Sequence, residues 1–309
     1  MIKNGFHKMK KFQAWISACR LRTLPLSISG AIVGSGVAYS KGLLDLSVFM
    51  LTVLTTLSFQ ILSNLANDYG DGVKGTDNEN RIGPERALQS GIISPKQMRN
   101  AIVVNVVICL FLVVSLVYQA FGADQFFTSF IFIVLGVLAI TAAIKYTVGA
   151  SAYGYKALGD VMVFLFFGWL SVLGTYFLYS KQIDFLMILP ASTIGLLSTG
   201  VLNLNNMRDF ESDKLSDKHT LVGYLGLKNA RIYHLTLIFT AMLLMLLYFA
   251  LSSEDLSIPL IMIGLTPLFI HLNIFYKVQN PKHYDPQLKV LALSTFLLAL
   301  IFGTCHILI

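Results

Sequence analysis

Apolar stretches recur along the chain, separated by shorter polar segments. Nine of them predict helices, at about 23–40, 46–66, 101–120, 126–145, 159–180, 185–203, 232–251, 257–276 and 289–308. Each is close to the roughly 20 residues that cross the hydrocarbon core of a bilayer. The short strands of alternating polarity that build a membrane barrel are not seen. We therefore expect an all-α, polytopic membrane protein that forms one domain over residues 1–309.

The composition agrees with this pattern. Hydrophobic residues make up 55% of the chain and charged residues only 13%, whereas soluble domains carry about a quarter charged residues. The low charge excludes an ordinary soluble enzyme. The net charge of +7 would suggest a nucleic-acid partner only in a basic soluble domain, and the pattern of apolar stretches predicts no such domain.

The basic residues mark one side of the predicted bundle. Of the 23 Lys and Arg, only Lys41 and Lys181 fall in the segments on the other side. Cytoplasmic segments of membrane proteins carry the excess of Lys and Arg. We therefore expect the N-terminus in the cytoplasm and the C-terminus outside, as nine spans require. The predicted cytoplasmic segments are residues 1–20, 67–100, 146–158, 204–231 and 277–289.

The first polar cluster, NLANDYGDGVKGTD at 64–77, follows the second predicted span. If the helix continues through it, Asn64, Asp68 and Asp71 share one face at i, i+4 and i+7. Carboxylates that close repel one another unless a cation or a proton lies between them. Asp77 lies beyond a Gly that we expect to end the helix. It could bind a metal or cap the next element.

The second cluster, NLNNMRDFESDKLSDKHTL at 203–221, follows the sixth predicted span. Asn205, Asp209 and Asp213 recur in it at intervals of four, which is again one helical face. Two acidic clusters on the same side of the membrane can bind a hard cation through oxygen ligands. Mg²⁺ suits a few carboxylates together with water and phosphate oxygens.

Basic residues lie among these acids. Lys74 and Arg86 follow the first motif, and Arg208 lies within the second. Acids that bind a metal, next to bases that bind anionic oxygens, point to a diphosphate bridged by Mg²⁺. The chain has no GxxxxGK[ST] and so no P-loop. A diphosphate at the edge of a membrane suggests a lipid tail held between the apolar spans.

At these residues the chain resembles the UbiA superfamily of intramembrane prenyltransferases. Its NxxxDxxD pattern is met by Asn64, Asp68 and Asp71, and its DxxxD pattern by Asp209 and Asp213. Within the superfamily, the chain is similar to the branch that acts on 1,4-dihydroxy-2-naphthoate in menaquinone biosynthesis. It lacks the YPxxKR-like segment of the 4-hydroxybenzoate enzymes. The stretches that carry this similarity are RLRTLPLSISG at 20–30, the block at 64–91, YGYKALGDVMVFLFFGWL at 153–170, the second cluster and the LGLKNAR that follows it.

The resemblance implies a Mg²⁺-dependent enzyme of the bacterial cytoplasmic (inner) membrane, surrounded by membrane lipids, with its active site on the cytoplasmic side. It would transfer a polyprenyl group from a polyprenyl diphosphate to 1,4-dihydroxy-2-naphthoate, releasing CO₂ and diphosphate and giving demethylmenaquinol. The chain length of the tail and the oligomeric state stay open.

The resemblance also assigns roles to residues. Asp68, Asp71, Asp209 and Asp213 are the expected catalytic, metal-binding acids. Asn64 and Asn205 are expected to add metal ligands or to orient the acids. The other expected substrate contacts are Asn67, Lys74, Arg86, Arg208, Arg22, Lys145, Tyr146, Tyr153 and Asp160. Arg22 could meet the naphthoate carboxylate or the diphosphate, and helix-end snorkelling or capping explains Lys145 and Asp160 almost as well.

Two alternatives stay open. The same chemistry could act on another aromatic acceptor, such as 4-hydroxybenzoate. A divalent-cation transporter would also use acidic clusters, but it should place ionisable groups along a pathway near the bilayer midplane. The predicted spans are nearly free of acids, which favours the enzyme.

Overall fold

The computed structural model describes residues 2–77, 82–252, 258–278 and 280–308. In these ranges, nine helical segments are long and apolar enough to cross a membrane. The all-α class and the nine predicted spans are therefore confirmed, and the protein is an integral membrane protein. Residues 78–81 of the predicted segment 67–100, and residue 257 of the eighth predicted span, lie outside the described residues.

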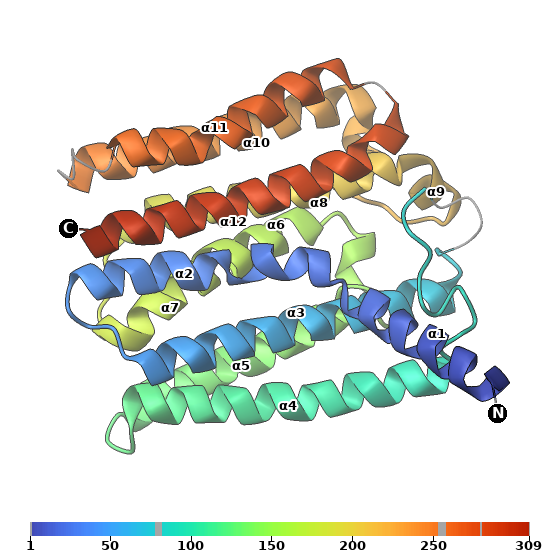
Figure 1. Ribbon diagram of the computed structural model, residues 1–309, viewed down its shortest axis with the longest axis horizontal. Coiled ribbons are helices and arrows are strands. Elements are labelled where there is room, and N and C mark those ends of the chain that lie inside the picture. The colour runs from blue at the N-terminus through green and yellow to red at the C-terminus, as the bar shows by residue number, and fades with distance from the viewer. Residues whose placement is uncertain (1, 78–81, 253–257, 279, 309) are drawn as a thin grey trace.

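The helices follow one another along the chain, and the connection between α3 and α4 runs from residue 75 to residue 94 (Figure 1). The first half contains α1 (Ile2–Cys19), the 3-10 turn η1 (Leu21–Thr23), α2 (Leu24–Ser40), α3 (Leu46–Lys74), α4 (Pro95–Phe121) and α5 (Phe126–Lys145). The second half contains η2 (Tyr153–Tyr155), α6 (Gly159–Val163), η3 (Phe164–Leu170), α7 (Ser171–Ser180), η4 (Phe185–Met187), α8 (Ile188–Arg208), α9 (Phe210–Leu215), α10 (Leu221–Ser252), α11 (Ile258–Lys277), η6 (Pro281–His283) and α12 (Tyr284–Leu308). The fifth predicted span, 159–180, is one rod made of α6, the π-helical η3 and α7.

The long helices lie side by side, and the two ends of the chain lie at opposite ends of the bundle (Figure 1). The short helix α9 lies at the same end as the N-terminus, as does the connection that follows α3. The segments predicted to carry the chemistry are thus gathered at one end. We call this the polar end of the bundle.

The helix α3 continues well beyond the predicted boundary at residue 66. It begins at the N-cap Asp45, whose carboxylate accepts the backbone N–H groups of Ser47 and Val48. It ends at Gly75, which adopts the left-handed conformation (φ 75°) of a helix C-cap. The acidic segment is therefore helical, and the predicted sharing of one helix by Asn64, Asp68 and Asp71 is confirmed.

Burial differs sharply between the helices. The helices α2, α8 and α12 form the centre of the bundle, where Val33, Leu197 and Phe302 are fully buried. The helices α4 and α5 instead turn large apolar side chains outward, and Phe111 is 70% exposed. A soluble monomer rarely exposes so much apolar surface. The outer face is suited to contact with lipid tails.

The central helices approach closely where glycines meet. A Cβ added at Gly36 of α2 would lie 2.9 Å from the Cα of Gly303 on α12. That atom belongs to the backbone and cannot move aside without shifting a helix. Small residues allow such close packing between membrane helices, where lipid tails supply no hydrophobic driving force.

We expect Gly36→Ala to lower the melting temperature of the detergent-solubilised protein, because overpacking a tight contact costs about 1–3 kcal/mol. The matched control is Gly223→Ala on α10, where the added Cβ meets only Thr220 Oγ1 at 3.6 Å. Thermal unfolding followed by circular dichroism would compare the two. Equal melting temperatures would contradict the close α2–α12 packing.

Candidate active site

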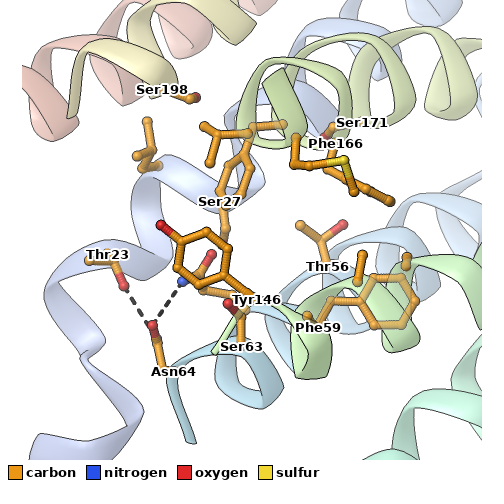
Figure 2. Close-up of a pocket in the computed structure, with 18 of the residues that line it drawn as sticks. Thr23, Ser27, Thr56, Phe59, Ser63, Asn64, Tyr146, Phe166, Ser171 and Ser198 are labelled. Carbon is orange, nitrogen blue, oxygen red and sulfur yellow. Dashed lines mark hydrogen bonds between the residues drawn. The ribbon is translucent and has the colours of Figure 1, made fainter. Parts of the chain in front are cut away.

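A cavity of about 400 Å³ runs between α2, α3, α5, the α6–α7 rod and α8, and we call it the main cavity. Most of its length is apolar, with Phe59, Phe132 and Phe166 among the lining side chains (Figure 2). Its other end is polar. The lining residues there are Arg22, Asn64, Asn67, Asp71, Arg86, Tyr146, Tyr153, Asn205, Arg208 and Lys218.

A second, small cavity of about 20 Å³ adjoins the polar end. This volume is enough for one water molecule or an ion of that size. Asp71, Arg86, Asn205 and Lys218 line both cavities and so connect them. The remaining lining residues are Thr76, Asp77, Asp209, Ser212 and Asp213.

Asp71 is the acid of the first motif that reaches both cavities. Its Oδ1 accepts a hydrogen bond from the Tyr155 hydroxyl at 2.7 Å. The same hydroxyl lies 2.6 Å from Thr76 Oγ1. Lys74 lines neither cavity and lies over the Tyr155 ring, 3.9 Å from its centroid. Tyr155 therefore lies between Asp71 and the basic residue Lys74, which the sequence predicted as a substrate contact.

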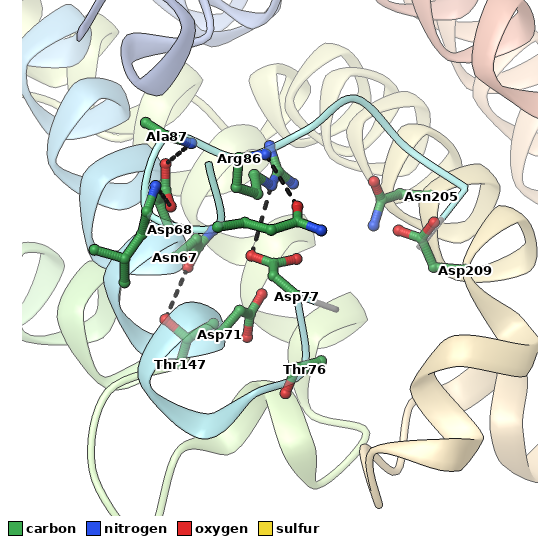
Figure 3. Close-up of polar contacts among 12 residues, drawn as sticks. Asn67, Asp68, Asp71, Thr76, Asp77, Arg86, Ala87, Thr147, Asn205 and Asp209 are labelled. Carbon is green, nitrogen blue, oxygen red and sulfur yellow. Dashed lines mark hydrogen bonds and ion pairs between the residues drawn. The ribbon is translucent and has the colours of Figure 1, made fainter. Parts of the chain in front are cut away.

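Asp68 faces away from both cavities. Its carboxylate accepts the backbone N–H groups of Ala87 and Leu88, at 3.1 and 3.2 Å, and the residue is 1% exposed (Figure 3). The segment that it holds carries Arg86, whose Nε lies 3.9 Å from Asp77 Oδ2. Asp68 thus fixes the segment that brings Arg86 to the site.

The two asparagines of the first motif are held by neighbouring elements. Asn64 Nδ2 donates to the Cys19 carbonyl at 2.9 Å and to Thr23 Oγ1 at 3.4 Å (Figure 2). It ties α3 to the junction before α2. Asn67 Oδ1 accepts the Thr147 hydroxyl at 3.3 Å (Figure 3). Both side chains form part of the wall of the main cavity.

The second motif is interrupted where the sequence predicted one continuous helical face. Helix α8 ends at Arg208, and α9 begins only after Asp209. The backbone N–H of Asp209 still bonds to the Asn205 carbonyl at 3.0 Å, and that of Asp213 to the Asp209 carbonyl at 2.8 Å. The hydrogen bonds between residues four apart are therefore kept across the break between the two helices. All three side chains therefore line the small cavity.

Arg208 is buried beside these acids and is only 1% exposed. Its Nε and Nη2 bind the two oxygens of Asp209 at 2.8 and 2.6 Å, which is the bidentate geometry of a strong ion pair. Nη2 also donates to Asn205 Oδ1 at 2.8 Å. Arg208 therefore fixes Asn205 and Asp209 relative to each other.

Asp285, in the first turn of α12, completes this network, and the sequence did not predict it as a site residue. Its Oδ1 lies 2.5 Å from Arg208 Nη1, and its Oδ2 lies 3.6 Å from Arg22 Nη1. The Asp285 carboxylate thus connects Arg208 and Arg22, two arginines that the sequence predicted as substrate contacts. The first turn of a helix favours an acid, and Asp285 occupies that place at the polar end.

Lys218 joins the two motifs and was also missed as a site residue, although it lies inside the second cluster. Its Nζ lies 3.7 Å from both Asp71 Oδ2 and Asp213 Oδ1. Burial alone would lower the pKa of this ammonium, but the carboxylates of Asp71 and Asp213 outweigh burial and raise it. Lys218 therefore stays charged between the two acids.

Two predicted tyrosines stand together at the cavity wall. The ring of Tyr146 packs edge-on against that of Tyr153, with centroids 5.3 Å apart. The Tyr153 hydroxyl donates to the Ala142 carbonyl at 2.9 Å. Burial raises the pKa of Tyr146 to about 12. Tyr146 is therefore a neutral hydroxyl group at neutral pH.

Lys145 and Asp160 are not brought to the site. Lys145 is exposed at the end of α5, and Asp160 is buried in α6, where it hydrogen-bonds to Tyr233. Neither residue lines the main or the small cavity. Their expected contact with substrate therefore stays a prediction that the two cavities do not support.

The donor set of the small cavity suits Mg²⁺. Asp71, Asp77, Asp209 and Asp213 supply carboxylates and Asn205 supplies an amide oxygen, which are the hard oxygen ligands that this ion prefers. Within the described ranges, no three His, Cys, Asp or Glu side chains are already grouped as a metal site. The donors fit the ion in chemical type, and Lys218 lies between two of them.

We expect Lys218→Met to lower the stability of the metal-free protein by about 3 kcal/mol, because the two acids lose the cation between them. Added Mg²⁺ should then raise the melting temperature of this variant more than that of the unaltered protein. The control is Lys214→Met, an exposed lysine on α9. An equal response to Mg²⁺ in all three proteins would contradict the bridging role of Lys218.

Comparison with known proteins identifies the family. Residues 27–304 match the family described as the UbiA prenyltransferase family. The Escherichia coli (strain K12) protein named 1,4-dihydroxy-2-naphthoate octaprenyltransferase is 40% identical over 295 residues, which are 96% of this chain and 95% of that protein.

Solved structures share the fold at low sequence identity. The apo structure of a UbiA homolog from Aeropyrum pernix K1 has a TM-score of 0.66 and 14% identity, covering 94% of this chain and 98% of that one. A UbiA homolog from Archaeoglobus fulgidus, solved bound to GPP and Mg²⁺, has a TM-score of 0.58 and 15% identity, covering 93% and 100%. The chain belongs to the UbiA prenyltransferase family.

Proposed function

We propose that this protein transfers a polyprenyl group from a polyprenyl diphosphate to 1,4-dihydroxy-2-naphthoate, with release of diphosphate and CO₂, to give demethylmenaquinol. The observation that carries the proposal is the joining of the two cavities. A long apolar cavity ends at a small one lined by acids and bases. The name of the Escherichia coli relative, similar over nearly its whole length, supports naphthoate as the acceptor.

The diphosphate would bind where the two cavities meet. Arg86 and Lys218 line both and supply positive charge for its oxygens. Asp71, Asp209 and Asp213 would bind Mg²⁺, with Asp77 and Asn205 as further oxygen donors. Bound there, Mg²⁺ would neutralise charge that develops on the leaving diphosphate. The Archaeoglobus fulgidus homolog, bound to GPP and Mg²⁺, supports this assignment.

The apolar cavity protects the reacting carbon. When the allylic C–O bond breaks, positive charge develops on the prenyl group, and water would trap it as an alcohol. The rings of Phe59 and Phe166 line the cavity and exclude water from it. Aromatic ring faces also attract positive charge. The electron-rich naphthoate ring carbon then forms the new C–C bond.

The departure of CO₂ simplifies the last step. The carboxyl group leaves from the carbon that would otherwise lose a proton, so restoring aromaticity needs no dedicated base. Arg22, with a side chain that is 44% exposed, stands at the polar end near Asp285. It is available to the naphthoate carboxylate or to the diphosphate.

Several predicted ligands take positioning roles in this proposal. A metal-binding Asp68 would first have to release the N–H groups of Ala87 and Leu88. We therefore assign Asp68 to holding the segment that carries Arg86. Asn64 orients α3, and Arg208 orients Asp209. Lys74 acts on Asp71 through Tyr155.

We also propose a bacterial inner-membrane location with the polar end in the cytoplasm. The N-terminus lies at that end and the C-terminus at the other (Figure 1). The support for sidedness is the distribution of charge, because only Lys41 and Lys181 among the 23 basic residues lie in segments of the opposite end. Prenyl donor and aromatic acceptor would then enter from the cytoplasmic leaflet.

We expect Asp71→Asn and Asp213→Asn each to lower the transfer rate at least about 100-fold, because each removes a carboxylate that would hold the Mg²⁺ that neutralises the leaving diphosphate. The matched control is Asp217→Asn, whose carboxylate on the same segment is 91% exposed. The rate is the formation of prenylated product, followed by mass spectrometry. Equal losses in all three variants would contradict the assignment.

The acceptor is tested by supplying membranes with a polyprenyl diphosphate and either 1,4-dihydroxy-2-naphthoate or 4-hydroxybenzoate. We expect product only from the naphthoate, with a mass that shows the loss of CO₂. Product from 4-hydroxybenzoate alone would overturn the acceptor assignment. If divalent metal ions entered proteoliposomes and no prenyl product formed, the proposal that the protein is an enzyme would be overturned.

A further inference from the structure

Ser198 of α8 carries a buried hydroxyl group that has no hydrogen-bond partner among the described residues. The residue is 2% exposed, and it lines the main cavity (Figure 2). A buried hydroxyl group without a partner costs free energy, so its presence in a folded protein needs an explanation. A ligand in the main cavity that hydrogen-bonds to Ser198 would remove this cost.

Other hydroxyl groups of the spans are satisfied within their own helices. Thr199, the next residue, donates to the Gly195 carbonyl at 2.9 Å. Ser294 of α12 donates to the Val290 carbonyl at 2.8 Å. Serine commonly makes this bond to the carbonyl four residues back in a helix, but Ser198 does not make it. The Ser198 hydroxyl group is therefore available to a molecule in the cavity.

Ser198 lies where the polar end of the main cavity gives way to the apolar part. It precedes Asn205, which lines both cavities, by seven residues of α8, or about 10 Å along the helix. Its neighbours on the cavity wall of α8 are Val201 and Leu202, which are apolar. One polar group on an apolar wall is typical of a site that orients a small molecule.

Arg22 and Lys289 line the main cavity nearer the polar end. The helices α8 and α12 run in opposite directions, since α8 ends and α12 begins at the polar end (Figure 1). Gly200 lies beside Leu291, because a Cβ added at Gly200 would be 3.2 Å from Leu291 Cδ2. By this register, the backbone of Ser198 is about four residues, or about 6 Å, deeper in the bundle than that of Lys289.

The proposed acceptor has polar groups that suit this arrangement. Its carboxylate is an anion, which the cations near the polar end would attract. The 1-hydroxyl group is next to the carboxylate on the ring and can donate a hydrogen bond to it within the molecule. The 4-hydroxyl group is too far from the carboxylate for such a bond. It is therefore the acceptor group that needs a partner from the protein.

We propose that Ser198 hydrogen-bonds to the 4-hydroxyl group of 1,4-dihydroxy-2-naphthoate and thereby selects this acceptor. The inference rests on the proposed function and adds a residue that recognises the acceptor ring. With the carboxylate toward Arg22 and Lys289, the 4-hydroxyl group is directed deeper, toward Ser198. A site that hydrogen-bonds a hydroxyl group disfavours a ligand without one, because the polar group of the site then stays unpaired.

The test measures binding to the purified full-length protein in detergent, with Mg²⁺ and inorganic diphosphate but no prenyl donor, so that no turnover occurs. The ligands are 1,4-dihydroxy-2-naphthoate, 4-hydroxy-2-naphthoate and 1-hydroxy-2-naphthoate, titrated anaerobically in a calorimeter. The unaltered protein should bind 1,4-dihydroxy-2-naphthoate about threefold to tenfold more tightly than 1-hydroxy-2-naphthoate, because a neutral hydrogen bond contributes about this much.

Ser198→Ala should weaken binding of the two ligands that have a 4-hydroxyl group by about threefold to tenfold. It should leave the affinity for 1-hydroxy-2-naphthoate unchanged. The matched control is Ser294→Ala, which removes a buried hydroxyl group that is paired within α12 and lines neither cavity. This control should change none of the three affinities. Thermal unfolding followed by circular dichroism checks that both variants are folded.

Ser171 provides a second comparison inside the same cavity. Its buried hydroxyl group also lacks a partner among the described residues, and it lines the main cavity. However, Ser171 packs against α2, where a Cβ added at Gly30 would collide with its Oγ. We therefore expect Ser171→Ala to leave the three affinities unchanged. A loss that is specific to the 4-hydroxyl group in Ser171→Ala and absent in Ser198→Ala would overturn the assignment.

The inference and the proposed function fail in different ways. If Ser198→Ala binds all three ligands as the unaltered protein does, or weakens all three equally, recognition of the 4-hydroxyl group by Ser198 is overturned and the proposed function stands. Equal affinity of the unaltered protein for 1,4-dihydroxy-2-naphthoate and 1-hydroxy-2-naphthoate overturns it too, even if Ser198→Ala does not fold. If the unaltered protein neither binds nor prenylates 1,4-dihydroxy-2-naphthoate, the proposed function falls and the inference falls with it.

Discussion

Carboxylates gathered at the edge of a membrane repel one another, and the arrangement of the polar end depends on how this repulsion is balanced. Lys218 lies between Asp71 and Asp213, and Arg208 lies between Asp209 and Asp285. Each cation joins acids from different elements. The same ion pairs therefore balance the charge of the acids and hold the parts of the site together. Removing one cation would leave buried acids facing each other.

The fold could be predicted from the sequence because it depends mainly on local features of the chain, namely the length and polarity of each span. Length and polarity alone mark the nine spans, and the left-handed Gly75 ends α3 where a glycine was expected. Helical spacing also placed Asn205, Asp209 and Asp213 around one cavity, even though the helix breaks at Asp209. Hydrophobic patterning and helical periodicity need no knowledge of distant contacts.

The rest of the site depends on contacts between segments far apart in the chain, which periodicity cannot supply. Asp68 has the right spacing for a metal ligand, yet its carboxylate is taken up by the backbone at Ala87 and Leu88. Tyr155 and Lys218 meet Asp71 because their two loops are joined, with the Ala157 N–H bonded to the His219 carbonyl at 2.8 Å. Asp285 comes from the last helix. None of these pairings leaves a local pattern in the sequence.

The position of Asp285 bears on how the protein is made. A membrane protein is synthesised from its N-terminus, so α12 enters the bilayer after the other eight described spans. Until then the buried Arg208 lacks one of its two carboxylates, and Arg22 lacks its ion-pair partner. A chain with eight spans inserted would hold both aspartate motifs but not the network that orients them. Insertion of the ninth span thus completes the ion-pair network that joins Arg22, Arg208 and Asp285.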